Sequence, residues 1–238
     1  MTPTPPGTGG PVPAHVAWVA RWTAQGPGSP DAEERASLAL VDTAQHLGIG
    51  WITIQEPSGG RALRLRAVEL ASRGVALACV PPATGDGPAT GDGPATGDGP
   101  ATEDGPATED GSADRVVGPG PRDLVQVEAP ALRVLLAEEA SGRRELVAAV
   151  RALARRGVRP KDVSEAAIGG ALGVPDVDLL VLTGGDRRVP DLLVWQVAYS
   201  EIVVLDERWP EVGPAQFHAA VAEYQRRDRR YGGLVASR

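Results

Sequence analysis

The chain lacks the features of several protein classes. It has one cysteine, Cys79, among 238 residues, which excludes an internal disulfide and a cysteine-rich metal site and favours a reducing compartment. One Phe and 4% aromatic residues leave the core to Leu, Val and Ala. No apolar run has the length of a membrane span, and the first residues show no pattern of a secretory signal. We therefore expect a cytoplasmic protein whose membrane contact is at most peripheral.

The formal net charge of −7 originates in a single segment. Residues 82–111 are five hexapeptides, PATGDG three times and PATEDG twice, and they carry seven acidic residues and no basic one. Without them the formal charge is zero, and no basic patch with interleaved aromatics indicates a nucleic-acid partner. Because a Pro, Gly and Asp repeat cannot bury apolar area, we expect a disordered insert at residues 82–112. Proline also spreads the acids too far apart for a calcium loop.

Short apolar runs alternate with helical patterns along the rest of the chain. Such alternation predicts an α/β fold with about six mainly parallel strands flanked by helices. We expect one domain over residues 15–238, preceded by a disordered tail at residues 1–14. The expected strands are residues 16–20, 51–55, 75–80, 131–137, 178–182 and 202–205, and the expected helices are residues 31–47, 61–73, 143–156, 190–200 and 216–230.

The segment 178–210 carries the strongest functional signal. An apolar strand at residues 178–182 leads into Gly184 and Gly185, where the chain can turn tightly and point N–H groups at an anion. Arg187 and Arg188 follow, and guanidinium groups match phosphate oxygens in geometry. Since ligands of parallel sheets bind beyond the carboxyl ends of the strands, this turn predicts an anion site.

The ordered motifs TGGDRRVPDLLVWQVAYSE, WPE and RRDRRYGG resemble the cis-prenyltransferases of the undecaprenyl diphosphate synthase type. The resemblance is dense from Asp176 to Gly233 and weaker at SGRREL and HVAWVA, so that it covers most of the chain outside the repeat. It implies a six-stranded parallel sheet and a homodimer. It also implies condensation of isopentenyl diphosphate with an allylic diphosphate, with magnesium as cofactor.

The resemblance assigns roles to individual residues. The substrate contacts that it implies are Gly184, Gly185, Arg188, Arg230 and Gly232. The last two form the R-x-G motif, which in the family reaches a substrate site from the subunit interface. Glu201, the acid of AYSE, is the implied magnesium ligand. Ordinary structural interpretations stay open, because Arg188 could be a solvated surface arginine and Glu201 an ion-pair partner.

The same resemblance shows what the chain has lost. Leu182 stands where the family has its first diphosphate-binding Arg, and Pro190 stands where it has a Ser. The run from His15 to Arg21 lacks the D-G-N-G segment, which carries the family's magnesium and catalytic Asp, so no residue is assigned a catalytic role. Losing one such electrostatic group costs roughly 10²–10³-fold in rate. We predict little or no prenyl transfer by the isolated chain.

Three functions remain open at this stage. The chain can be a non-catalytic relative, which forms either a homodimer or a heterodimer with an active cis-prenyltransferase. Alternatively, it is an active transferase with a divergent first site, which magnesium-dependent product formation by the protein alone would favour. A third possibility is a diphosphate-binding regulator, for which isopentenyl diphosphate would bind tightly without turnover.

Overall fold

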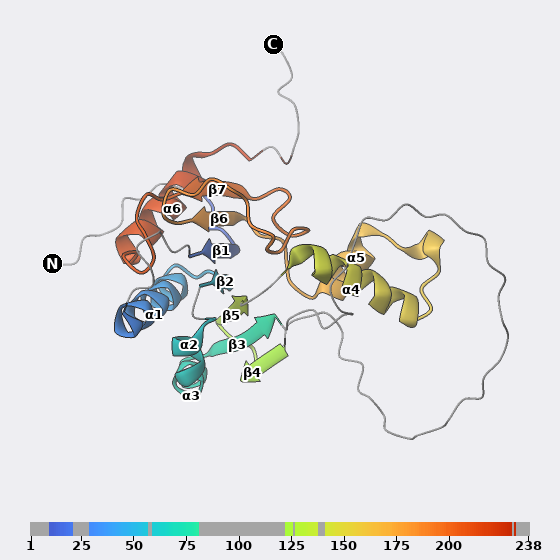
Figure 1. Cartoon of the computed structure of the whole chain (residues 1–238), viewed down its shortest axis with the longest axis horizontal. Coiled ribbons are helices and arrows are strands. Elements are labelled where there is room, and N and C mark those ends of the chain that lie inside the picture. The colour runs from blue at the N-terminus through green and yellow to red at the C-terminus, as the bar shows by residue number, and fades with distance from the viewer. Residues whose placement is uncertain are drawn as a thin grey trace, which may run out of the picture.

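The computed structural model describes residues 10–20, 29–56, 59–80, 122–125, 127–137, 141–229 and 231. These residues form a seven-stranded sheet in the order β4-β3-β5-β2-β1-β6-β7 (Figure 1). Its strands are β1 (His15–Val19), β2 (Trp51–Gln55), β3 (Val75–Val80), β4 (Arg122–Val125), β5 (Leu132–Ala137), β6 (Leu179–Leu182) and β7 (Glu201–Val204). All neighbouring strands are parallel except β3 and β4. The predicted, mainly parallel α/β fold is confirmed.

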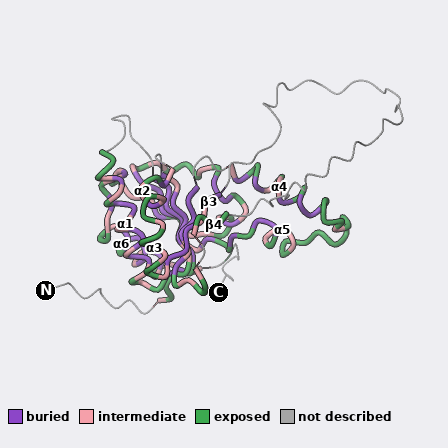
Figure 2. The backbone as a smooth tube through the Cα atoms, turned by 90° about the horizontal axis from the view of Figure 1, so that it is seen from below, coloured by how far each residue is buried: buried purple, intermediate pink, exposed green. Residues whose placement is uncertain are grey.

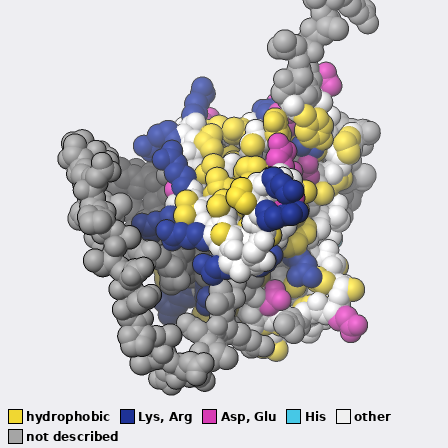
Figure 3. All heavy atoms as spheres, turned by 90° about the vertical axis from the view of Figure 1, so that its right-hand side faces the viewer, with side chains coloured by type: hydrophobic (Ala, Val, Ile, Leu, Met, Phe, Trp, Pro, Cys, Tyr) yellow, Lys and Arg dark blue, Asp and Glu magenta, His cyan; other side chains and the backbone are white. Residues whose placement is uncertain are grey.

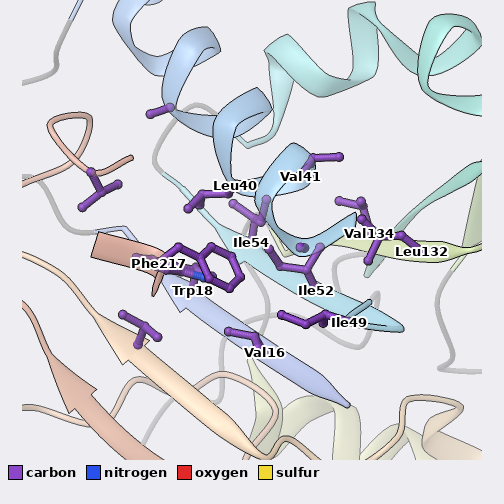
Figure 4. Packing of buried hydrophobic residues seen from close by; sticks show 14 of the residues in the cluster. Val16, Trp18, Leu40, Val41, Ile49, Ile52, Ile54, Leu132, Val134 and Phe217 are labelled. Carbon is purple, nitrogen blue, oxygen red and sulfur yellow. The ribbon is translucent and has the colours of Figure 1, made fainter. Parts of the chain in front are cut away.

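Helices cover one face of the sheet and enclose the larger core. They are α1 (Pro30–His46), α2 (Arg61–Leu65), α3 (Ala67–Ser72) and α6 (Pro214–Arg226). Their buried residues meet the same-facing residues of β1, β2, β3 and β5. Figure 4 shows the centre of this core, where the rings of Trp18 in β1 and Phe217 in α6 lie 5.2 Å apart. Two large aromatic side chains therefore fix α6 against the middle of the sheet.

The other face is covered mainly by irregular chain. Val174, Val177, Leu192 and Leu193 pack on the inward residues of β1, β5 and β6. The remaining two helices, α4 (Gly142–Arg155) and α5 (Glu165–Leu172), pack on each other around a small core of their own. Figure 2 shows that this helix pair projects to one side of the buried strands.

One predicted helix is absent. Residues 190–200 form successive turns rather than a helix, although their apolar spacing suits one. The Asp191 carbonyl accepts the Gly142 N–H at 3.0 Å, and the Asp191 carboxylate accepts the Arg143 N–H at 3.1 Å, so this residue serves the start of α4 instead. Leu193 has a φ of 46°, which a continuous helix does not allow. Tertiary contacts therefore override the local pattern.

Smaller differences concern element ends and one strand. The predicted helix 61–73 is broken at Arg66, and α6 ends at Arg226, so the last arginines follow the helix instead of extending it. Strand β4 and helix α5 were not predicted, because RDLV lacks an apolar run and EAAIGGAL contains two adjacent glycines. The repeat at residues 82–112 lies outside the described residues, as do residues 1–9 of the expected tail. Residues 10–14 lie within them, and the Gln225 amide donates to the Gly10 carbonyl at 2.9 Å.

Candidate functional site

The two ends of the parallel strands matter for function, and neither of them is an outer strand of the sheet such as β4 or β7. We call the C-edge the one at which the parallel strands end and the N-edge the one at which they begin. The Gly184-Gly185 turn follows β6 and lies at the C-edge, where ligands of parallel sheets bind. Glu201 is the first residue of β7 and lies at the N-edge. The register pairs Glu201 with Leu179, so the length of β6, roughly 10 Å, separates it from the turn.

The glycine turn is shaped as expected but its donors are occupied. Gly184 and Gly185 have φ values of 73° and 70°, in the left-handed region that favours glycine. Their N–H groups donate to the carbonyls of Glu207 at 2.7 Å and Leu205 at 2.9 Å. These two N–H groups fasten the turn to the segment after β7. The substrate contact predicted for Gly184 and Gly185 stays a prediction.

Arg188 is engaged by a neighbouring acid. Its Nε and Nη2 donate to the two carboxylate oxygens of Asp186, each at 3.0 Å, and its backbone N–H donates to Asp186 Oδ1 at 3.0 Å. The Asp186 carboxylate raises the pKa of the Arg188 guanidinium. Three donors that could hold a phosphate therefore hold an internal carboxylate. Leu182, in the place of the family's first arginine, is 1% exposed and packed in the core.

Glu201 is part of an ion-pair network at the N-edge. Arg227 Nη1 donates to Glu201 Oε2 at 3.1 Å and to the Ile202 carbonyl at 2.8 Å, while its Nε donates to Glu223 at 3.3 Å. Among the described residues, no group of three or more His, Cys, Asp or Glu side chains could hold a metal ion. The described residues thus do not fit a magnesium site that joins Glu201 to the glycine turn of the same chain. Its role as a metal ligand stays a prediction.

The R-x-G motif is only partly visible. Arg230 and Gly232 lie outside the described residues, but Arg229 and Tyr231 on either side of Arg230 are described. Arg229 Nη1 donates to Asp178 Oδ1 at 2.7 Å, and Asp178 immediately precedes β6. Arg229 is therefore attached at the N-edge, where Glu201 also lies.

Sequence reasoning missed two carboxylates at the C-edge. Glu56 directly follows β2 and is only 3% exposed, next to the end of β1, where Ala20 N–H donates to the Gln55 carbonyl at 2.7 Å. Asp206 follows β7, and its Oδ1 lies 3.6 Å from where a Cβ on Gly185 would stand. An acid directly after a largely buried apolar strand is the signal that could have identified Glu56, whereas Asp206 lies two residues after the partly exposed β7.

A third acid, Glu145, is buried at the start of α4. It is 6% exposed, and burial together with the nearby Asp191 raises its pKa to about 7. Asp191 is itself tied to α4, since the Ser141 hydroxyl donates to its Oδ2 at 2.7 Å. A Cβ on Gly142 would lie 2.6 Å from Val194 N, so only glycine permits this contact. The chain that leaves the glycine turn is thus locked onto α4.

Part of the sequence resembles known proteins. Residues 125–232 match the family described as putative undecaprenyl diphosphate synthase. Isoprenyl transferase 2 of Bradyrhizobium diazoefficiens is 38% identical over 112 residues, 44% of each chain. The isoprenyl transferase of Geobacillus kaustophilus is 42% identical over 101 residues, 40% of this chain and 39% of the relative. The chain thus matches less than half the length of these relatives.

Two solved structures resemble almost the whole chain. A probable undecaprenyl diphosphate synthase from Campylobacter jejuni superposes with a TM-score of 0.62 at 16% identity, over 93% of this chain and 99% of the other. Lavandulyl diphosphate synthase from Lavandula x intermedia, in complex with dimethylallyl diphosphate, gives 0.60 at 18% identity over the same shares. The fold is therefore that of these prenyl diphosphate synthases. Residues 125–232 thus match the cis-prenyltransferase family in sequence, and the fold of the chain resembles that of solved prenyl diphosphate synthases.

Proposed function

We propose that this chain is a non-catalytic subunit that pairs with an active cis-prenyltransferase and donates its C-terminal R-x-G to the partner's site. The observation that carries the proposal is the separation of the retained family residues. Glu201 and the start of the tail lie at the N-edge, whereas the chain's own glycine turn lies at the C-edge. Residues at the N-edge lie too far from the glycine turn of their own chain to join a diphosphate site there, but they can join such a site on a second chain.

The state of the chain's own turn supports the same conclusion. A diphosphate arriving there would meet glycine N–H groups that already bind carbonyls and an Arg188 that already binds Asp186. Catalysis between two diphosphates depends on cationic groups that offset the developing charge. With Leu182 buried in the place of an arginine, the described C-edge offers little of that compensation.

A subunit contact is also favoured by the surface around α4. Val147 and Val150 of this helix are 50% and 46% exposed. Figure 3 shows hydrophobic side chains gathered on the side toward which α4 and α5 project, with Lys and Arg side chains beside them. An apolar patch with a polar rim is typical of a protein–protein contact.

The decisive experiment measures prenyl transfer with and without a partner. The purified chain, given farnesyl diphosphate, isopentenyl diphosphate and Mg²⁺, should form no product. When it is co-expressed with a catalytic cis-prenyltransferase from the same cells, the two should co-purify, and the partner's activity should rise. Elongation by the chain alone, at rates typical of the family, would overturn the proposal.

One observation favours a second candidate, an active enzyme with a divergent first site. Glu56 supplies a buried carboxylate at the C-edge, on the strand next to the one that carries the catalytic Asp in the family. In that case the chain alone would form product, and Glu56→Gln would abolish it, while Glu165→Gln, an exposed acid of α5, would leave it unchanged.

A further inference from the structure

A row of side chains crosses the sheet at the N-edge, on the face that is covered mainly by irregular chain. The register pairs His15 of β1 with Trp51 of β2, and Trp51 with Arg133 of β5. It also pairs Arg133 with Ala76 of β3. Paired residues of neighbouring strands point to the same face of a sheet. Leu135, two residues further along β5, belongs to the core on that face, so the row lies at the margin of this core.

The row ends in a hollow of about 350 Å³. This volume lies within the range of roughly 300–1,000 Å³ that is usual for ligand sites. Figure 1 shows β5, β3 and β4 side by side at one end of the sheet, and these strands supply most of the walls. The lining residues are Ala76, Asp123, Val125, Val127, Glu128 and Arg133. The hollow therefore combines charged and apolar side chains, as a site for a small polar molecule requires.

Trp51 holds the Arg133 guanidinium in place. The guanidinium lies 5.6 Å from the centre of the Trp51 ring, a cation–π distance, and the Trp51 ring lies 6.0 Å from that of His15. His15 Nδ1 donates to the Pro175 carbonyl at 3.0 Å, which leaves Nε2 to accept from the Thr53 hydroxyl at 2.9 Å. Burial lowers the pKa of His15 to about 4, so at neutral pH its ring is uncharged and does not repel the guanidinium.

The three charged side chains of the hollow are available to a ligand. Asp123 and Glu128 are exposed and Arg133 is half-buried, and none of them forms an ion pair with a residue that the structure describes. The segment that carries Glu128 is fixed where the Ala131 N–H donates to the Gly74 carbonyl at 2.9 Å. Two negative charges and one positive charge thus line a single hollow without satisfying one another.

We propose that this hollow is a binding site for a free basic amino acid of the L-lysine type. Such a molecule carries two cationic groups, which match Asp123 and Glu128, and one carboxylate, which matches the Arg133 guanidinium. Its methylene chain suits the apolar walls at Val125 and Val127. A simple diamine would leave the guanidinium unpaired, and a neutral amino acid would leave one of the acids unpaired. The site is independent of the function proposed above, and its test needs no partner subunit.

Calorimetric titration of the intact purified chain at low ionic strength tests the ligand class. L-Lysine should bind with one molecule per chain and a Kd of about 1 mM or tighter. L-Norleucine lacks the side-chain ammonium and cadaverine lacks the carboxylate, so each should bind roughly tenfold more weakly. No binding of L-lysine, or equal binding of the three compounds, would overturn the inference.

Variants locate the site. In Arg133→Gln, L-lysine should lose its advantage over cadaverine, whereas Arg133→Lys keeps the charge and should retain most of it. In the double variant D123N/E128Q, L-lysine should lose its advantage over L-norleucine. Glu165→Gln and Arg155→Gln, at exposed residues of α5 and α4, are the matched controls and should bind as the wild type does. An unchanged preference in the variants of the hollow, or an equal loss in the controls, would overturn the site.

Discussion

The buried Glu145 should make the protein less stable as the pH rises. Burial and the neighbouring Asp191 raise its pKa from the ordinary 4.5 to about 7. Between these two values the folded chain holds a proton that the unfolded chain has released, so the free energy of unfolding falls as the pH rises. At 1.36 kcal/mol per pH unit, the loss between pH 4.5 and pH 7 reaches about 3 kcal/mol.

Glu145→Gln isolates this effect, because the amide keeps the shape and cannot ionise. The variant should match the wild type near pH 4.5 and exceed it by up to about 3 kcal/mol near pH 7.5. Urea unfolding at half-unit pH steps measures both curves, and Glu165→Gln, at an exposed acid, serves as the control. The reasoning is refuted if the difference between variant and wild type stays constant across this range.

The other predictions concern a buried histidine and the turn region. Burial lowers the pKa of His15 from 6.5 to about 4, so His15→Gln should remove a contribution to the free energy of unfolding that grows by about 3 kcal/mol as the pH rises from 4 to 6.5. Gly142→Ala should destabilise by about 1–3 kcal/mol by overpacking, whereas Gly170→Ala, in open space on α5, should stabilise by about 0.5–1 kcal/mol; thermal unfolding compares them. Asp186→Asn should release Arg188 and tighten binding of inorganic pyrophosphate, measured by calorimetry; unchanged affinity would mean that the internal carboxylate does not compete with an anion.

His15 and Glu145 act in opposite directions over almost the same pH range. Stability linked to His15 is lost as the pH falls from 6.5 to 4, and stability linked to Glu145 is lost as the pH rises from 4.5 to 7. Their contributions nearly cancel between pH 4.5 and 6.5. The wild type should therefore show little net pH dependence over this range, and the contribution of each residue appears in the difference between its variant and the wild type.

The sheet was predictable because burial on both faces leaves continuous apolar runs. Runs such as LLVL and VALACV are typical of strands that are covered on both faces in a mainly parallel sheet. The conformation of residues 190–200 was not predictable, because their apolar spacing suits a helix. The hydrogen bonds of Asp191 with the start of α4 favour turns in its place. A local sequence pattern does not show such partners, because Ser141 and Arg143 lie 50 and 48 residues before Asp191.

The sequence indicates candidate site residues but not how they lie relative to one another. The motifs located the glycine turn and the R-x-G tail, and no spacing in the sequence tells that β6 separates Glu201 from the turn. Nor does the sequence show that Asp186 occupies the donors of Arg188. Those facts follow from strand register and side-chain direction, which exist only once the chain is folded.

Asp178 brings the two ends of the described chain together, and this has a practical consequence. Gly10 lies against Gln225, and Ala14 shares the Asp178 carboxylate with Arg229. A short linker could therefore join Gly10 to Tyr231, and new ends could be opened between β3 and β4, far along the chain from both. Such a circular permutant should fold. It would lack residues 1–9 and 232–238 and keep the seven strands of the sheet, so it would give a subunit without the end of the R-x-G motif.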